Sequence, residues 1–225
     1  KDEEIANYFV EYKDEVVKIR RELHKIPEIG FETEKTASYL KDKLLNYGFE
    51  INEVLENGLI AYKKGSSSKK AVAFRADMDG LELNEATGVD YSSTHPGKMH
   101  GCGHDGHMTI LLGFARYLSE FEELKRDVVL IFQPAEESPG GAEPLVENGI
   151  FADYNIAAIF GLHIYPGLEE GKIGIKSGAL TAQSGEVDID LIGKGSHGAQ
   201  PHDGKDALFI ASQLLSNYQG IISRN

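Results

Sequence analysis

The chain has 225 residues, of which 41% are hydrophobic and 26% charged, a composition typical of a globular protein. Acidic residues outnumber basic ones by 36 to 23, and the net charge of −13 argues against binding to nucleic acid or to anionic membranes. No apolar run approaches the ~20 residues that span a bilayer, and the N-terminus does not resemble a signal peptide. The single cysteine cannot form a disulfide within the chain, which favours a reducing cytoplasm.

Helix-like and strand-like patterns alternate through most of the chain. Apolar residues recur every three or four positions in the predicted helices, and short apolar runs rich in β-branched residues mark the strands. The helices are expected at residues 2–24, 33–47, 105–121 and 206–223. The strands are expected at residues 50–54, 59–63, 70–76, 127–132 and 156–164. This alternation predicts an α/β fold with a mostly parallel sheet.

The pattern changes near residue 182. Residues 185–193 alternate apolar and acidic side chains, as in a strand with one face in water. A glycine-rich turn and the helix at 206–223 follow, and one strand with one helix cannot close a domain. The sequence therefore predicts two domains, at residues 1–182 and 183–225, and we expect both to be incomplete.

Residues 100–107 read HGCGHDGH and are the densest group of candidate ligands in the chain. Histidine and cysteine bind borderline-soft divalent metals, and the intervening glycines let the backbone turn so that nearby donors converge. A cysteine alone is more often a small buried side chain. His104 two residues later, with acidic residues downstream, favours a metal site that includes Cys102.

Further candidate donors follow two of the predicted strands. Glu136 and Glu137 come directly after one strand, and His163 lies near the end of the next. Paired glutamates are usually solvated, and a histidine in an apolar run is usually part of the core. Ligands nevertheless gather at the carboxyl ends of strands in α/β sheets. The expected metal ligands are Cys102, His104, Glu137 and His163, with Glu136 beside them as a candidate general base.

Five motifs occur in the order RADMDG, HGCGHDGH, QPAEE, GLH and GKGSHGAQPH. Together they resemble the metallo-amidohydrolases and metallopeptidases of the aminoacylase–carboxypeptidase superfamily. The branch is that of bacterial N-acyl-amino-acid amidohydrolases, hippurate hydrolases and indole-acetyl-amino-acid hydrolases, and the match is to the N-terminal part of that family. The resemblance implies a catalytic domain with two divalent metal ions, and an inserted α+β lid domain that mediates homodimerisation. Residues 1–182 would belong to the catalytic domain and 183–225 to the lid.

The resemblance also implies a reaction and residue roles. The reaction is hydrolysis of the amide bond of a small-molecule N-acyl amino acid, with zinc, manganese or nickel as the metal. Cys102, His104, Glu137 and His163 match metal ligands. Glu136 matches the general base that activates a metal-bridging water, and His197 matches a lid histidine that steadies the oxyanion, often in the other subunit.

Two departures from the family pattern matter. Related peptidases begin the metal site with His-x-Asp, whereas this chain has Asp77, Met78 and Asp79, so either aspartate is expected to orient a ligand histidine. The family also takes a metal-binding histidine from a C-terminal region beyond Asn225. We therefore expect the 225-residue piece alone to be inactive.

Other functions stay open at this point. The substrate can be N-acetyl-diaminopimelate in lysine biosynthesis, a hippurate or a generic N-acetyl amino acid. A different enzyme class would use Cys102 as a nucleophile activated by His104 or His107. A third possibility is an inactive metal-binding fragment. No catalytic role is expected for His24, His95, His107 or His202, although His107 can brace the site.

Overall fold

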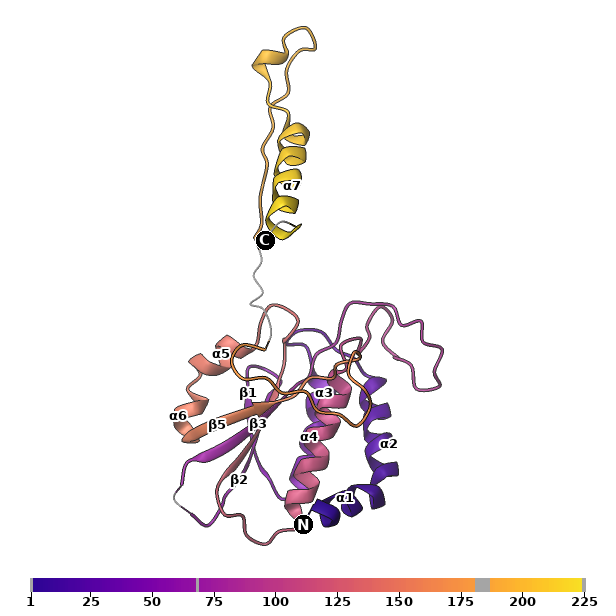
Figure 1. The fold of residues 1–225 in the computed structure, drawn as a ribbon, viewed down its shortest axis with the longest axis vertical. Coiled ribbons are helices and arrows are strands. Elements are labelled where there is room, and N and C mark those ends of the chain that lie inside the picture. Colours follow the sequence, from indigo (N-terminus) through magenta and orange to yellow (C-terminus); the bar gives the residue numbers. More distant parts are fainter. Residues whose placement is uncertain (1, 68, 181–186, 224–225) are drawn as a thin grey trace. The chain divides into compact units, whose positions relative to one another are not determined.

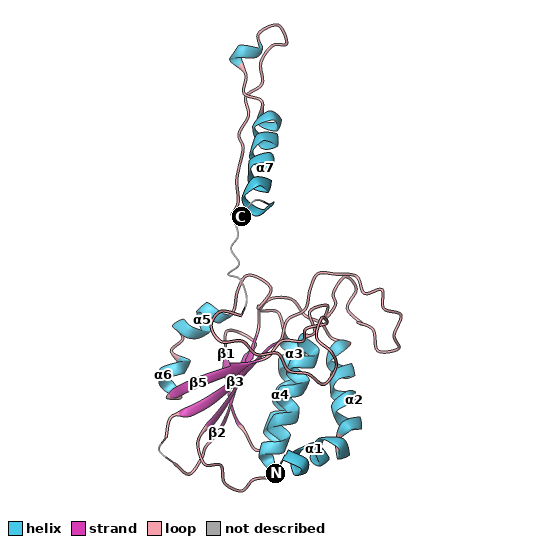
Figure 2. Ribbon diagram, in the orientation of Figure 1, coloured by secondary structure: helices cyan, strands magenta, loops and turns pink. Residues whose placement is uncertain are grey.

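The computed structural model describes residues 2–67, 69–180 and 187–223, and the chain divides into two compact units, residues 1–169 and 170–225. The first unit contains a five-stranded sheet with helices on both faces (Figures 1 and 2). Its helices are α1 (Asp2–Glu11), α2 (Lys13–His24), α3 (Glu34–Asn46), α4 (His104–Ser119), α5 (Ala142–Glu147) and α6 (Ile150–Asp153). Its strands are β1 (Glu50–Val54), β2 (Gly58–Lys63), β3 (Ala71–Asp77), β4 (Val128–Gln133) and β5 (Ile156–Gly161). These elements confirm the predicted α/β class.

The strand order is β1-β2-β4-β3-β5. Strand β3 pairs in parallel with β4 and β5, whereas β2 pairs antiparallel with β1 and β4. The sheet is therefore mixed, and the expected predominance of parallel pairing is not confirmed. The reason is the short connection after β1, where Leu55 and Glu56 turn the chain at φ angles of 48° and 60°. A connection this short can only return the chain antiparallel.

Side chains of β4 alternate between two cores, one on each face of the sheet. Leu130 and Phe132 pack with residues of α3 and α4, while Val129 and Ile131 pack with residues of α5 and α6. All six residues of β4 are buried, as expected for a solid apolar run at the centre of a sheet. The helices thus cover both faces and leave the ends of the strands free to carry functional groups (Figure 1).

The single helix expected over residues 2–24 is wrong in one respect, because the chain bends at Tyr12 and forms α1 and α2. The bend lets aromatic side chains of both parts contact α4. The ring of Tyr8 lies 5.1 Å from that of Tyr117, and the guanidinium of Arg116 lies 3.7 Å from the ring of Tyr12. Periodicity alone does not reveal such a bend, because the apolar spacing continues through it.

The second unit contains the 3₁₀ turn η1 (Pro201–Asp203) and helix α7 (Ala207–Ser223). The strand expected at 185–193 is wrong for residues 187–193, which form no strand, and residues 185–186 lie outside the described part. A strand requires a hydrogen-bonded neighbour, and in this region the structure records only an isolated bridge between Lys194 and Lys205. The roles of the two predicted domains stay a prediction.

None of the described helices has the length and apolar character needed to cross a membrane.

Helix α3 offers a matched test of the core. The side chain of Leu44 is fully buried, whereas that of the neighbouring Leu45 is 50% exposed. We expect Leu44→Ala to lower the free energy of unfolding by about 2–5 kcal/mol, because it leaves a cavity between α3 and the sheet. Leu45→Ala should change it by less than about 0.5 kcal/mol. Urea denaturation measures both, and equal losses would contradict this description of the core.

Candidate metal centre

The candidate site lies where the parallel strands end. Strands β3, β4 and β5 run in the same direction, so the segments that follow them meet at one edge of the sheet. Asp79 follows β3, Glu136 and Glu137 follow β4, and His163 follows β5. The start of α4 reaches the same place, because the Sγ of Cys102 lies 3.3 Å from the Nε2 of His163.

Besides the buried group of Asp77, His104 and His107, candidate metal-binding atoms converge here in two overlapping groups that also share His104. Cys102, His104 and His163 form one group, and His104, Glu136 and Glu137 form the other. Within each group the donor atoms lie within 4.8 Å of one another. The Nε2 of His104 lies 3.8 Å from a carboxylate oxygen of each glutamate. The two groups place candidate ligands for two neighbouring cations at one edge, of which the single Nε2 lone pair of His104 could bind only one.

Each histidine of these groups is oriented through its Nδ1 atom. The Nδ1 of His104 lies 2.8 Å from the backbone oxygen of Asp79, and that of His163 lies 2.7 Å from the backbone oxygen of Ile164. A backbone oxygen can only accept, so each Nδ1 donates and each Nε2 carries the lone pair of the ring, which in His163 faces the thiol of Cys102. The Nε2 of His104 is buried and has no hydrogen-bond partner among the described residues. A buried acceptor without a partner is costly, and a bound cation would satisfy it.

Asp79 holds the turn that carries the two glutamates. Its two carboxylate oxygens accept the backbone N–H groups of Glu136 and Glu137, each at 3.0 Å. The preceding residue, Ala135, has a φ angle of 55°, a conformation uncommon for a residue other than glycine. Asp79 is almost fully buried, so these bonds are shielded from water. The carboxylate therefore stabilises a strained turn and directs both glutamate side chains toward His104.

The site carries an excess of negative charge. Burial, together with the nearby carboxylates of Glu137 and Glu136, raises the pKa of the Cys102 thiol to about 12. Burial alone would lower the pKa of His104, but the carboxylates of Asp79 and Asp77 outweigh it and raise that pKa above its usual value. The contributions of the carboxylates to both shifts reflect a negative potential that favours bound protons. A divalent cation would relieve this potential and compete with those protons for the same atoms.

The structure thus brings together five of the six site residues expected from the sequence. Cys102, His104, Glu136, Glu137 and His163 lie at the sheet edge, and Asp79 contacts His104 as the motif comparison suggested. The sixth, His197, belongs to the second unit, where its Nδ1 accepts the backbone N–H of Ala199 at 3.2 Å. Its expected role near the oxyanion stays a prediction.

Sequence reasoning missed the environment of His24. The Nδ1 of this buried histidine lies 2.7 Å from Asp105 and its Nε2 lies 3.1 Å from Glu85. The hydrogen bond to Asp105 is the main cause of a raised pKa of His24. The pair links α2 to the first turn of α4, directly after His104. The only signal in the sequence is the aspartate that follows His104, and nothing pairs it with a residue 81 positions away.

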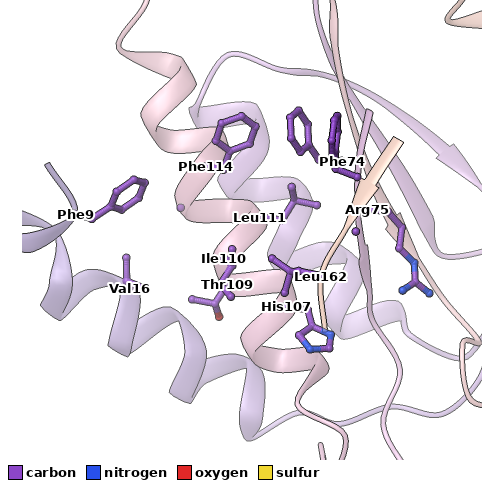
Figure 3. A pocket seen from close by; sticks show the side chains of 13 residues that line it. Phe9, Val16, Phe74, Arg75, His107, Thr109, Ile110, Leu111, Phe114 and Leu162 are labelled. Atoms are coloured by element: carbon purple, nitrogen blue, oxygen red, sulfur yellow. The ribbon is translucent and has the colours of Figure 1, made fainter. Parts of the chain in front are cut away.

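An apolar pocket of about 470 Å³ lies apart from the donor atoms. Figure 3 shows it between α2, α4 and the ends of β3 and β5, with His107 at one side. None of the five clustered donors is among its lining residues. Its walls are formed by residues such as Phe9, Phe74 and Phe114, so it offers hydrophobic contact rather than ligands.

These donors lie at the carboxyl edge of an α/β sheet and form a candidate site for divalent metal ions. The chain belongs to peptidase family M20/M25/M40, whose profile matches residues 73–219. The family resemblance inferred from the five motifs is thereby confirmed.

Individual relatives agree with this assignment. The chain is 46% identical over 215 residues to the N-acetyldiaminopimelate deacetylase of Bacillus licheniformis and 44% identical over 214 residues to that of Bacillus subtilis. Each match covers 94% of this chain and 57% of the relative, so the chain spans little more than half the length of these proteins.

Two solved structures are also similar. A dinuclear metal-binding M20 peptidase from Bacillus subtilis is 38% identical, with a TM-score of 0.70 over 73% of this chain and 46% of its own. A structure from methicillin-resistant Staphylococcus aureus is 28% identical, with a TM-score of 0.82 over all of this chain and 60% of its own. The dinuclear metal site of the first relative agrees with the two donor groups found here.

The role of Asp79 can be tested without metal. In the presence of a chelator, Asp79→Asn should lower the free energy of unfolding by about 1–3 kcal/mol, because the amide offers only one oxygen to two buried N–H groups. The matched control Asp42→Asn, on the exposed surface of α3, should change it by less than about 0.5 kcal/mol. Equal stabilities of the two variants would show that the turn does not depend on Asp79.

Proposed function

We propose that this protein hydrolyses the amide bond of small-molecule N-acyl amino acids with the help of two divalent metal ions. The observation that carries the proposal is the pair of donor groups that share His104. Cys102, His104, His163 and Glu137 are the proposed ligands, and Glu136 is the proposed general base. The thiol and imidazole donors favour zinc, while the carboxylates also suit manganese or nickel.

The donor atoms fit such ions in both position and charge. The Nε2 atoms of His104 and His163 have the lone pairs that a cation requires, and the thiol of Cys102 lies between histidine and carboxylate. The negative charge of the carboxylates at the site would be balanced by the positive charge of two divalent cations. These are properties of the donor set itself and do not depend on the family match.

In the proposed mechanism, bound cations would polarise the amide carbonyl and make the attacking water more acidic. Glu136 accepts a proton from that water and passes it to the leaving amine. Its side chain is 38% exposed, so water and substrate can reach it. Asp79 keeps Glu136 in place through its backbone N–H. We further propose that His197 donates a hydrogen bond to the developing oxyanion, as the family resemblance suggests.

N-acetyldiaminopimelate is the substrate we propose first. The relatives that are 42–46% identical to this chain carry the name N-acetyldiaminopimelate deacetylase, and removal of an acetyl group from an amino acid is the same reaction type. We also propose that the protein acts in the cytoplasm, where the free Cys102 would stay reduced, and that it forms a homodimer through residues 183–225.

The alternative, a thiol nucleophile, is less favoured. Such an enzyme needs a thiolate, which forms where nearby positive charge lowers the pKa. The environment of Cys102 has the opposite character, since burial and two carboxylates raise its pKa. A mechanism based on Cys102 attack would also leave Glu136 and Glu137 without a role.

The two glutamates can be assigned by variants, because both lie at the same distance from His104. Glu136→Gln should lower kcat by about 10²–10⁴-fold while the protein keeps its bound metal, because a general base is lost and no ligand is. Glu137→Gln should instead lower the metal content. Elemental analysis and steady-state kinetics separate the two, with the exposed Glu147→Gln as control. Loss of metal from Glu136→Gln to the same extent would reverse the assignment.

The reaction class is tested with a substrate panel and a chelator. We expect turnover of N-acetyldiaminopimelate to exceed that of other N-acetyl amino acids and of N-benzoylglycine, measured on the full-length protein with zinc, manganese or nickel added in turn. A chelator should abolish this turnover, and an alkylating reagent should act only when metal has been removed. Activity that survives the chelator but not alkylation would favour the thiol mechanism.

A further inference from the structure

His107 lies in the first turn of α4, is almost fully buried, and uses both nitrogen atoms of its ring. Its Nδ1 lies 2.6 Å from the Oδ1 of Asp77, at the end of β3. Its Nε2 lies 2.9 Å from the backbone nitrogen of Ile164, in the segment that follows β5. One side chain therefore connects three elements that end at the candidate metal centre.

These partners determine which nitrogen carries the proton. The backbone N–H of Ile164 can only donate, so the Nε2 of His107 must accept. Burial would raise the pKa of Asp77, but the hydrogen bond from His107 and nearby positive charge lower it to about 2, so its carboxylate accepts. Only the neutral ring with its proton on Nδ1 satisfies both bonds. Although His107 lies close to Asp77 and His104, its lone pair is already in use and it does not act as a ligand.

Ile164 is also held by its side chain. A Cβ atom on Gly106 would lie 2.6 Å from the Cδ1 of Ile164, and one on Gly103 would lie 3.2 Å from the same atom. The two glycines thus leave a space at the start of α4 that the isoleucine fills. Close packing and the hydrogen bond to His107 together fix the backbone of Ile164 against the helix.

The position of Ile164 determines that of His163. The backbone oxygen of Ile164 accepts the Nδ1–H of His163 at 2.7 Å, which leaves the Nε2 atom 3.3 Å from the Sγ of Cys102. The rings of His107 and His163 are also in contact, with centroids 4.6 Å apart. Any shift of Ile164 would therefore move the Nε2 of His163 relative to the other donors.

We propose that His107 is a positioning residue that places His163 in the metal site, by accepting the backbone N–H of Ile164 at Nε2. This inference rests on the proposed function, since it assumes that His163 binds metal. According to this inference, the position of His163 depends on the hydrogen bond between the Nε2 of His107 and Ile164, and not on the shorter bond between His107 and Asp77. A purely structural role for His107 would depend instead on the Asp77 bond, which is shorter and more deeply buried.

Two conservative variants separate these roles. In His107→Gln the side-chain oxygen can occupy the place of Nε2 and accept the N–H of Ile164, but the bond to Asp77 is lost. In His107→Asn the shorter amide can replace Nδ1 and donate to Asp77, but it cannot reach Ile164. We expect zinc affinity near the wild-type value for His107→Gln and about 10–100-fold lower for His107→Asn. His202→Asn, which alters an exposed histidine of the second unit, is the control.

Hydrogen exchange gives a second readout that needs no metal. In the metal-free protein, the backbone amide of Ile164 should be protected in the wild type and in His107→Gln and should exchange faster in His107→Asn.

A third readout uses cobalt in place of zinc. The near-ultraviolet band of cobalt bound to the Cys102 thiolate should persist in His107→Gln. Loss of affinity by His107→Gln with full affinity in His107→Asn would overturn the proposal.

A pair of apolar variants tests the same contact if the His107 variants do not fold. Gly106→Ala alters no polar atom but forces the Cδ1 of Ile164 to move, so it should weaken zinc binding. Ile164→Val removes that atom, and in the double variant the affinity should recover. A loss in Gly106→Ala that the double variant does not recover would contradict the proposal. If the wild type does not bind zinc, the proposed function is contradicted. If the wild type binds zinc and both His107 variants bind it equally well, only this inference is contradicted.

Discussion

The site depends on negative charge gathered at one edge of the sheet. The carboxylates of Asp77, Asp79, Glu136 and Glu137 all lie within reach of a single imidazole, that of His104. Like charges at such distances repel one another unless each is neutralised or hydrogen-bonded. Strand β3 and the start of α4 supply donors to the carboxylate of Asp77, and the segment after β4 supplies donors to that of Asp79. These hydrogen bonds offset the repulsion.

The four carboxylates divide into two kinds according to their partners. Asp77 accepts from His107 and Arg75, and Asp79 accepts from two backbone N–H groups, so both are buried and satisfied by the protein. Glu136 and Glu137 keep their carboxylates partly exposed, at 38% and 28%. The aspartates therefore hold the site in shape, and the glutamates are available for cations and substrate. This division distinguishes the two aspartates, at and just after the end of β3, from the two glutamates that follow β4.

Much of the fold and the site was predictable because the relevant signals are local. The run of β-branched residues in β4 and the donors of HGCGHDGH each lie in one short segment, and the parallel strands bring those segments together. The bend at Tyr12, the antiparallel return after β1 and the pairing of His24 with Asp105 depend instead on contacts between distant residues. A periodic pattern carries no record of such contacts, so it could not reveal them.

The start of α4 shows how one short motif can serve several purposes at once. His104 and His107 are three residues apart and so lie on the same face of the helix, where one presents its Nε2 to the metal site and the other to the backbone of Ile164. Asp105, between them in sequence, points to another side and pairs with His24 and Arg20. Gly106 completes the turn, and a Cβ atom there would lie 2.6 Å from the Cδ1 of Ile164. Helix geometry thus lets HDGH present His104 to the candidate metal site and His107 to Ile164 on one face, while Asp105 contacts His24 on another.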